Sequence, residues 1–320
     1  MSTTDLCLKN ELESEGYIVL RDVLDVERDL WPVELEYSRI LDGLTERMGV
    51  DTPDHTQPFC DRLCDFVRAN DVRFDRWFDI SLPQADVTPS TPMHTGPAIF
   101  ALLRCPRLLD AVEQFIGPEI YCNPVQHTRM KLPASCLGEH SRSDLSGDVA
   151  WHQDQAVITE DADDTELLTV WIPMTSATLE NGCMVVSPGS HRNLAPHCRS
   201  RRVSTLNQLS IPRECLADQT VNLPMEPGDV LFMHRRTQHS SLPNCSEKMR
   251  WSFDLRYQPV GQPSGRRWFP GFIARSRTWP TSELTDAGEW SRLWDTARSR
   301  LAKSENVPFN RWKDGDPYCA

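Results

Sequence analysis

His152 and Asp154 stand two residues apart, and His239 follows 85 residues after Asp154. On a β-strand, residues i and i+2 point to the same face, roughly 6.6 Å apart at about 3.3 Å of rise per residue. An imidazole and a carboxylate at that spacing can both reach one ion between them. A second imidazole from a distant strand would leave the opposite coordination positions open. That facial arrangement is typical of non-haem Fe(II) oxygenases.

Four histidines are candidates for the second imidazole. His191 lies in a Ser-Pro-Gly-Ser-His-Arg turn and His197 in an arginine-rich segment, so neither is on an evident strand. His234 ends an apolar run, where a hydrogen-bonded histidine of ordinary structural role would also fit. His239 lies eleven residues before Arg250, which leaves room for a strand end, a turn and the start of a neighbouring strand. We favour His239 over His234 once the resemblance described below is taken into account.

An arginine facing the same ion would have a definite role. A 2-oxoacid chelates iron through its carboxylate and keto oxygens, and its far carboxylate then needs a fixed cation. The planar guanidinium of arginine binds a carboxylate through two hydrogen bonds. Residues 250–257 alternate polar with apolar side chains, which predicts a strand with Arg250 on its polar face. Arg256 shares that face, and we expect it to form a salt bridge with Asp254.

Composition narrows the class of protein. The chain has 320 residues, of which 39% are hydrophobic and 25% charged, as in globular proteins. Its net charge of −12 argues against a protein that tracks nucleic-acid phosphates. The sequence shows neither a signal peptide nor a run of about eighteen apolar residues. We therefore expect a cytoplasmic protein that acts on a small molecule, with no membrane or nucleic-acid partner; the oligomeric state is not indicated.

The pattern of elements predicts helices first and a β-rich region after them. A short strand is expected at residues 17–20, and helices at residues 33–48, 59–78 and 99–116, the last interrupted near Pro106. From about residue 118, short β-prone runs alternate with turn residues, at 167–172, 183–186, 230–233 and 250–257. Many short strands at regular spacing indicate a sandwich or barrel.

We expect one domain, because no linker or repeat divides the chain. Its parts are a helical N-terminal region of about residues 1–117, a β-core of about 118–260 and a C-terminal extension of 261–320. Residues 134–150 and 193–215 have the composition of long loops, which are either binding-site lids or solvated excursions. Four tryptophans of the extension are expected to pack rather than to do chemistry: Trp268, Trp279, Trp290 and Trp294.

Several sequence motifs stand in a fixed order along the chain. They are residues 15–20, His127-Thr128 with Lys131, residues 151–154, residues 181–192, and residues 239–246 running into Arg250. In these motifs, over about residues 11–258, the chain resembles the phytanoyl-CoA dioxygenase family of Fe(II)/2-oxoglutarate-dependent oxygenases.

The resemblance implies a mainly β protein with N-terminal helices, built as a double-stranded β-helix or cupin-like jelly roll with iron between its two sheets. It implies that His152, Asp154 and His239 bind Fe(II), that Arg250 holds the distal carboxylate of 2-oxoglutarate, and that no catalytic residue is needed beyond the metal ligands. The family usually has an apolar residue at position 129. Further residues implied to line the cosubstrate pocket are Trp171, Ser241, Thr128 and Arg129.

The implied reaction is hydroxylation of a C–H bond of a small metabolite or natural-product intermediate. Fe(II), 2-oxoglutarate and O2 take part, succinate and CO2 are released, and ascorbate is expected to stimulate. Related halogenases have a small residue where this chain has Asp154, so the carboxylate favours hydroxylation. Desaturation, ring closure and epimerisation use the same ligands and stay open.

Three other functions also stay open. A demethylase of nucleic acid or protein is suggested by the spacing of Arg250 and Arg256, but the acidic net charge opposes it. A metal-binding jelly roll without activity is the second. A cupin-like enzyme that needs no 2-oxoglutarate, and therefore no Arg250, is the third. The acidic segment at residues 160–166 is either a solvated loop or a mouth that favours a cationic substrate.

Overall fold

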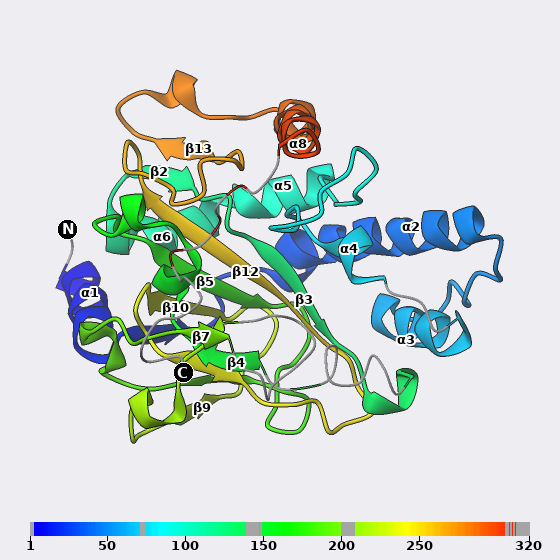
Figure 1. Ribbon diagram of the computed structural model, residues 1–320, viewed down its shortest axis with the longest axis horizontal. Coiled ribbons are helices and arrows are strands. Elements are labelled where there is room, and N and C mark those ends of the chain that lie inside the picture. Colours follow the sequence, from blue (N-terminus) through cyan, green and yellow to red (C-terminus); the bar gives the residue numbers. More distant parts are fainter. Residues whose placement is uncertain are drawn as a thin grey trace.

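Two antiparallel β-sheets form the centre of the computed structural model, which describes residues 3–70, 74–138, 147, 149–199, 209–304, 307, 309 and 311 (Figure 1). The larger sheet runs β1-β10-β5-β12-β2-β13, with β3 also paired to β12. Its strands are β1 (Tyr17–Leu20), β2 (Glu119–Cys122), β3 (His127–Lys131), β5 (Leu168–Pro173), β10 (Val230–His234), β12 (Arg250–Pro259) and β13 (Phe272–Ser276).

The smaller sheet runs β4-β11-β6-β9. It comprises β4 (Val149–His152), β6 (Met184–Val186), β9 (Val221–Leu223) and β11 (His239–Ser241). A further pair is formed by β7 (Cys198–Arg199) and β8 (Leu209–Ser210). Apolar side chains from both sheets meet in one buried cluster, which includes Trp171 and Leu231 of the larger sheet and Met184 and Val186 of the smaller. The two sheets therefore pack face to face, as in a jelly roll.

β12 holds the larger sheet together, because it pairs with β5 along one edge and with β3 and then β2 along the other. The period of two that the sequence shows here separates its two faces. Trp251 and Phe253 pack against Tyr37, with ring centroids 4.9 and 5.8 Å away. The polar residues Arg250 and Asp254 therefore face the smaller sheet.

Helices cover the outer face of the larger sheet (Figure 1). Tyr37 of α2 packs on β12, and Phe115 of α6 packs on Phe232 of β10 at 5.0 Å. Pro106 occupies the first turn of α6, where its missing N–H costs nothing, so the predicted interruption near Pro106 is confirmed. The helices are α1 (Thr3–Glu15), α2 (Trp31–Met48), α3 (Phe59–Asn70), α4 (Asp75–Phe78), α5 (Pro97–Leu103), α6 (Pro106–Ile116) and α8 (Ala287–Leu301).

The expected strands, and the helices expected at residues 33–48 and 99–116, are confirmed within a few residues of their predicted bounds. The single helix expected at residues 59–78 is wrong, because α3 ends at Asn70 and α4 is a separate short helix that begins after the non-helical Phe74. The C-terminal extension does not stand apart, because β13 joins the larger sheet beside β2 and α8 contacts α5. The division into three regions stays a prediction. Of the loop-like segments, residues 139–146, 148 and 200–208 lie outside the described residues. No helix in the described ranges is long and apolar enough to cross a membrane.

Three of the four C-terminal tryptophans pack as expected, and one does not. Trp290 and Trp294 on α8 are fully buried, and Trp268 is partly buried against the same core. The prediction that Trp279 packs against the core is wrong, because 68% of its surface is exposed. Trp279 follows β13 in a surface turn.

Trp294→Ala is expected to lower the free energy of unfolding by about 3–5 kcal/mol, because it empties a fully buried site beside Phe269. Trp279→Ala deletes the same side chain from the surface and is expected to stay within about 0.5 kcal/mol of wild type. Urea unfolding of both variants measures the difference. Equal losses would contradict the burial of α8 against the core.

Candidate metal centre

His152 and His239 come together because their strands pair. They are directly opposite each other in the ladder of β4 and β11, with ring centroids 4.2 Å apart. Gln153 is extended, with φ −124° and ψ 136°, so Asp154 points to the same side as His152 although β4 has ended. Gln153 itself points away and donates to the carbonyls of Asn193 and Arg236.

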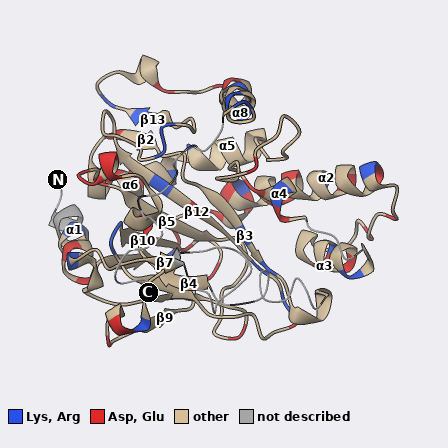
Figure 2. Cartoon of the chain, in the orientation of Figure 1, with Lys and Arg blue, Asp and Glu red and all other residues tan. Residues whose placement is uncertain are grey.

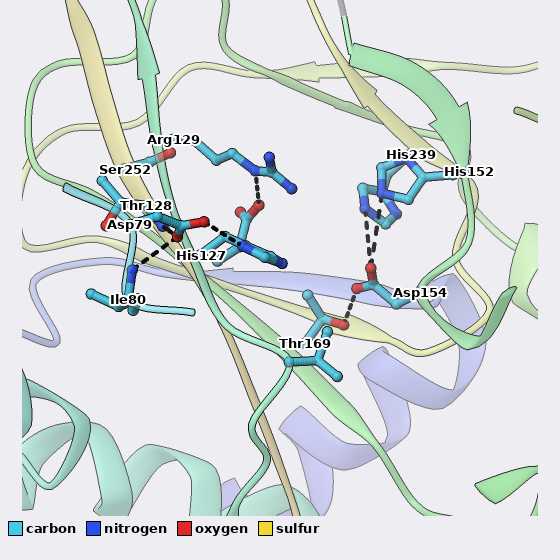
Figure 3. A network of polar contacts seen from close by, with 12 residues as sticks. Asp79, Ile80, His127, Thr128, Arg129, His152, Asp154, Thr169, His239 and Ser252 are labelled. Carbon is cyan, nitrogen blue, oxygen red and sulfur yellow. Dashed lines mark hydrogen bonds and ion pairs between the residues drawn. The ribbon is translucent and has the colours of Figure 1, made fainter. Parts of the chain in front are cut away.

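The three side chains surround one point (Figure 3). The Nε2 atoms of both histidines lie 3.9 Å from Oδ1 of Asp154, and all three ligand atoms lie within 4.8 Å of one another. His152 donates its Nδ1–H to the backbone carbonyl of Ala150, and His239 donates its Nδ1–H to that of Thr237. This hydrogen bond fixes the tautomer and leaves the Nε2 lone pair free for a metal.

The protonation states also suit a metal. Burial, together with the adjacent His239, lowers the pKa of His152 to about 3, so its imidazole is neutral at neutral pH. Burial would raise the pKa of Asp154, but Arg256 and the two imidazoles outweigh burial and lower it. A neutral imidazole and an ionised carboxylate are the forms that coordinate divalent cations.

Asp154 is held from the larger sheet. Thr169 on β5 donates its hydroxyl to Oδ2 (Figure 3). Arg256 on β12 donates Nη2 to Oδ1 at 2.5 Å. Arg256 also donates Nη1 to the carbonyl of Val125. The expected salt bridge of Arg256 with Asp254 is wrong: Asp254 instead accepts from Arg129, at 3.1 Å.

Thr169→Val is expected to weaken Fe(II) binding by about 10- to 100-fold, the usual effect of losing an outer hydrogen bond to a metal ligand. Anaerobic Fe(II) titration of the purified protein measures this. Thr45→Val is the matched control, since it removes an equally buried hydroxyl, bonded to Asp42 in α2, and should leave iron affinity unchanged. The same loss in both variants would mean that Thr169 acts only through stability.

Arg250 begins β12 and is buried between the sheets with 1% of its surface exposed. Its Nη1 donates to Ser252 at 2.6 Å and its guanidinium lies over the ring of Trp171, 5.7 Å from the centroid. No described carboxylate forms an ion pair with it, and its Nε has no hydrogen-bond partner. Burial lowers its pKa to about 10, so it remains charged at neutral pH. A buried cation without an anion is costly, which fits a site that receives one.

Other groups surround Arg250. Lys131 is its partner on β3 and donates Nζ to the carbonyls of Ser241 and Leu242. The hydroxyl of Ser241 is buried without a hydrogen-bond partner. Trp171 and its apolar neighbours close the space on one side. A buried hydroxyl without a hydrogen-bond partner and a buried guanidinium without an ion pair suit the far carboxylate of 2-oxoglutarate.

The sequence of this chain matches that of a known protein family. Residues 12–252 match the phytanoyl-CoA dioxygenase (PhyH) family. The chain belongs to this family. It is 36% identical over 261 residues to the 1-deoxypentalenic acid 11-beta-hydroxylase of Streptomyces arenae, covering 79% of this chain and 81% of that protein. It is 27% identical over 190 residues to the peroxisomal phytanoyl-CoA dioxygenase of Homo sapiens, covering 56% and 53%.

The solved structure of the non-heme monooxygenase ThoJ in its apo form covers 92% of this chain and 97% of its own, with a TM-score of 0.56 and 17% identity. This likeness shows the fold, a jelly roll with N-terminal helices. The fold class and the enzyme class predicted from the sequence are therefore confirmed. The protein is an Fe(II)/2-oxoglutarate-dependent oxygenase of the PhyH family.

The two remaining residues expected in the cosubstrate pocket differ in position. Thr128 lies on the outer face of β3, where its hydroxyl meets that of Tyr37 at 2.9 Å. The structure therefore does not bring Thr128 to the side of Arg250. Arg129, the next residue, points to the inner face, as the alternation of a strand requires.

The other histidine candidates have structural contacts. His191 donates Nε2 to the carbonyl of Glu13 and packs so closely on Gly16 that a Cβ there would lie 2.4 Å from its ring. His197 accepts from the backbone N–H of Gln153, and His234 from that of Arg236. Within the described part of the chain, only His152, Asp154 and His239 form a group that could hold a metal.

The sequence motifs assign no role to Thr169, and they include Lys131 only as a residue near His127-Thr128. Thr169 lies within a continuous apolar run, 15 residues from the aspartate that it contacts, so no local pattern marks it. Lys131 could have been found, because a lysine on the polar face of a buried strand needs a partner.

Proposed function

We propose that this PhyH-family oxygenase hydroxylates a C–H bond of a small, largely apolar natural-product intermediate. The observation that carries the proposal is the convergence of two free imidazole nitrogens and one ionised carboxylate beside a buried, unpaired guanidinium. The choice of substrate class is supported by the Streptomyces arenae relative, whose name states that it hydroxylates 1-deoxypentalenic acid.

His152, Asp154 and His239 would hold Fe(II), and Arg250 with Ser241, Lys131 and Trp171 would hold 2-oxoglutarate. Iron and cosubstrate together supply the oxidising power for an unactivated C–H bond, with release of succinate and CO2. The chain supplies geometry. Thr169 and Arg256 orient the carboxylate of Asp154, and the histidine Nδ1–H bonds orient both rings.

The residues that would hold the far carboxylate of 2-oxoglutarate are shielded from water. Arg250, Ser241 and Trp171 each have at most 2% of their surface exposed. In such surroundings a hydrogen-bonded ion pair is stronger than in water. The far carboxylate of 2-oxoglutarate therefore needs few contacts to fix the cosubstrate.

Anaerobic titration with Fe(II) and 2-oxoglutarate tests the site. A visible charge-transfer band that requires both is expected, and its absence despite bound iron would reject cosubstrate chelation. Turnover is then measured as succinate release with 1-deoxypentalenic acid and related polycyclic compounds. A product 16 Da heavier than the substrate supports hydroxylation, whereas a loss of 2 Da or an unchanged mass indicates desaturation or epimerisation.

The acidic segment at residues 160–166 gives little support for a cationic substrate. Asp163 pairs with Arg311 at 2.5 Å, Asp161 accepts from Thr159, and Glu166 accepts from Gln262. These carboxylates are engaged within the protein.

A further inference from the structure

Arg129 lies on the side of β3 that faces the candidate metal centre. It lies on the inner face of β3, opposite Ser252 of β12, and its guanidinium extends toward His152 and His239 (Figure 3). Although it is on an inner face, 45% of its side chain is exposed. His152 is 19% exposed as well. Solvent therefore reaches both the side chain of Arg129 and the triad.

Arg129 is held at one end only. Its Nε donates to Oδ2 of Asp254 at 3.1 Å, and neither Nη group has a hydrogen-bond partner among the described residues. Burial would raise the pKa of Asp254, but Arg129 and Arg256 lower it, so the carboxylate stays ionised. Asp254 thus fixes the plane of the guanidinium and leaves two donor groups free.

The nearby carboxylate of Asp79 does not satisfy those groups. It lies 3.1 Å from Nδ1 of His127, and it accepts from the backbone N–H groups of Thr128 and Ile80 (Figure 3). The contacts of Asp79 therefore belong to the start of β3. The guanidinium fork of Arg129 remains open toward the metal site.

Basic residues follow β3 and β12 (Figure 2). Two of them form ion pairs on this face, Arg256 with Asp154 and Arg129 with Asp254. The two charges of Fe(II) would be balanced by the two of 2-oxoglutarate. A substrate that reaches the triad would therefore meet a guanidinium whose Nη groups are open, which favours an anionic acceptor.

We propose that Arg129 binds a carboxylate of the substrate and thereby determines which C–H bond faces the iron. The proposal rests on the oxygenase function proposed above and names the chemical class of its substrate. A guanidinium held by Asp254 presents two parallel N–H groups, which match a carboxylate in distance and direction. Holding one end of a rigid substrate in this way fixes the position of its other carbons.

The test uses the Fe(II)·2-oxoglutarate form of the full chain under anaerobic conditions. Alicyclic monocarboxylic acids, with 1-deoxypentalenic acid among them, are titrated against the charge-transfer band, each in parallel with its methyl ester. Wild type is expected to bind at least one acid about tenfold or more tightly than its ester. Arg129→Met is expected to weaken binding of that acid by about 10- to 100-fold and to leave the ester unchanged.

Two further variants separate a binding role from a structural one. Arg129→Lys keeps the charge without the fork and should recover part of the acid affinity. Arg292→Met removes an exposed arginine of α8 and should change nothing. The affinity for 2-oxoglutarate should be equal in all of them.

Two results would overturn the proposal while the oxygenase function stands. One is equal binding of acid and ester by wild type across the panel. The other is a raised 2-oxoglutarate requirement in Arg129→Met with acid binding unchanged, which would assign Arg129 to the cosubstrate. Absence of the charge-transfer band in wild type would reject the proposed function and this inference with it.

Discussion

His239→Ala is expected to abolish Fe(II)-dependent turnover and to weaken iron binding by more than about a hundredfold. Losing an outer partner of a metal ligand already costs 10- to 100-fold, and this change removes a ligand. The ring of His239 is 4.2 Å from that of His152, and its Nε2 is oriented by the hydrogen bond from Nδ1 to Thr237. Anaerobic iron titration and succinate release measure the two effects.

His234→Ala is the matched control. His234 ends β10 and His239, five residues later, begins β11. Both were candidates for the distal metal ligand on the basis of the sequence. His234 instead accepts from the N–H of Arg236 and contacts the ring of His191. Its replacement is expected to reduce stability but to leave the charge-transfer band intact. Loss of the band in His234→Ala, with retention in His239→Ala, would exchange the two assignments.

The triad could be predicted from the sequence because two of its three residues, His152 and Asp154, are close together in the chain. His152 and Asp154 share a face through one extended residue, and that relation needs no tertiary information. The alternation of residues 250–257 likewise predicted both faces of β12. The same period separates Arg250 on the inner face from Trp251 on the helix-covered face.

Pairings between strands could not be found in this way. Arg256 and Asp254 are neighbours on one face, so a salt bridge between them was the reasonable local expectation. The fold brings Asp154, from the turn after β4, close to Arg256, and Arg129, from β3, close to Asp254. Each of the two residues therefore pairs with a residue from elsewhere in the chain. The expected position of Thr128 in the cosubstrate pocket is wrong for a related reason, because a shift of one residue along a strand moves a side chain to the other face of the sheet. Uncertainty of one residue in a motif is therefore enough to move a side chain out of the site.

Arg250→Lys is expected to raise the KM for 2-oxoglutarate by about 10- to 100-fold, because an ammonium cannot reproduce the two hydrogen bonds of the guanidinium. Iron binding alone should be unchanged, since Arg250 does not contact the triad. Arg266→Lys makes the same substitution at another buried arginine, which donates to the carbonyl of Val157. Its KM is expected to match wild type. An unchanged KM in Arg250→Lys would move the anchor to another cation.

The stability of Arg250→Met, measured by unfolding, tests the role of Arg250 independently of the KM. An arginine kept for stability is normally paired, and removing it from a buried pair costs several kcal/mol. Arg250 has no paired carboxylate in the described structure. Without cosubstrate, the free energy of unfolding of the variant is therefore expected to lie within about 1 kcal/mol of that of wild type.

Saturating 2-oxoglutarate with Fe(II) should raise the Tm of wild type, because a ligand that binds the folded state stabilises it. The variant should lose most of that increase. A large loss of stability without any cosubstrate would instead make Arg250 a structural residue of β12.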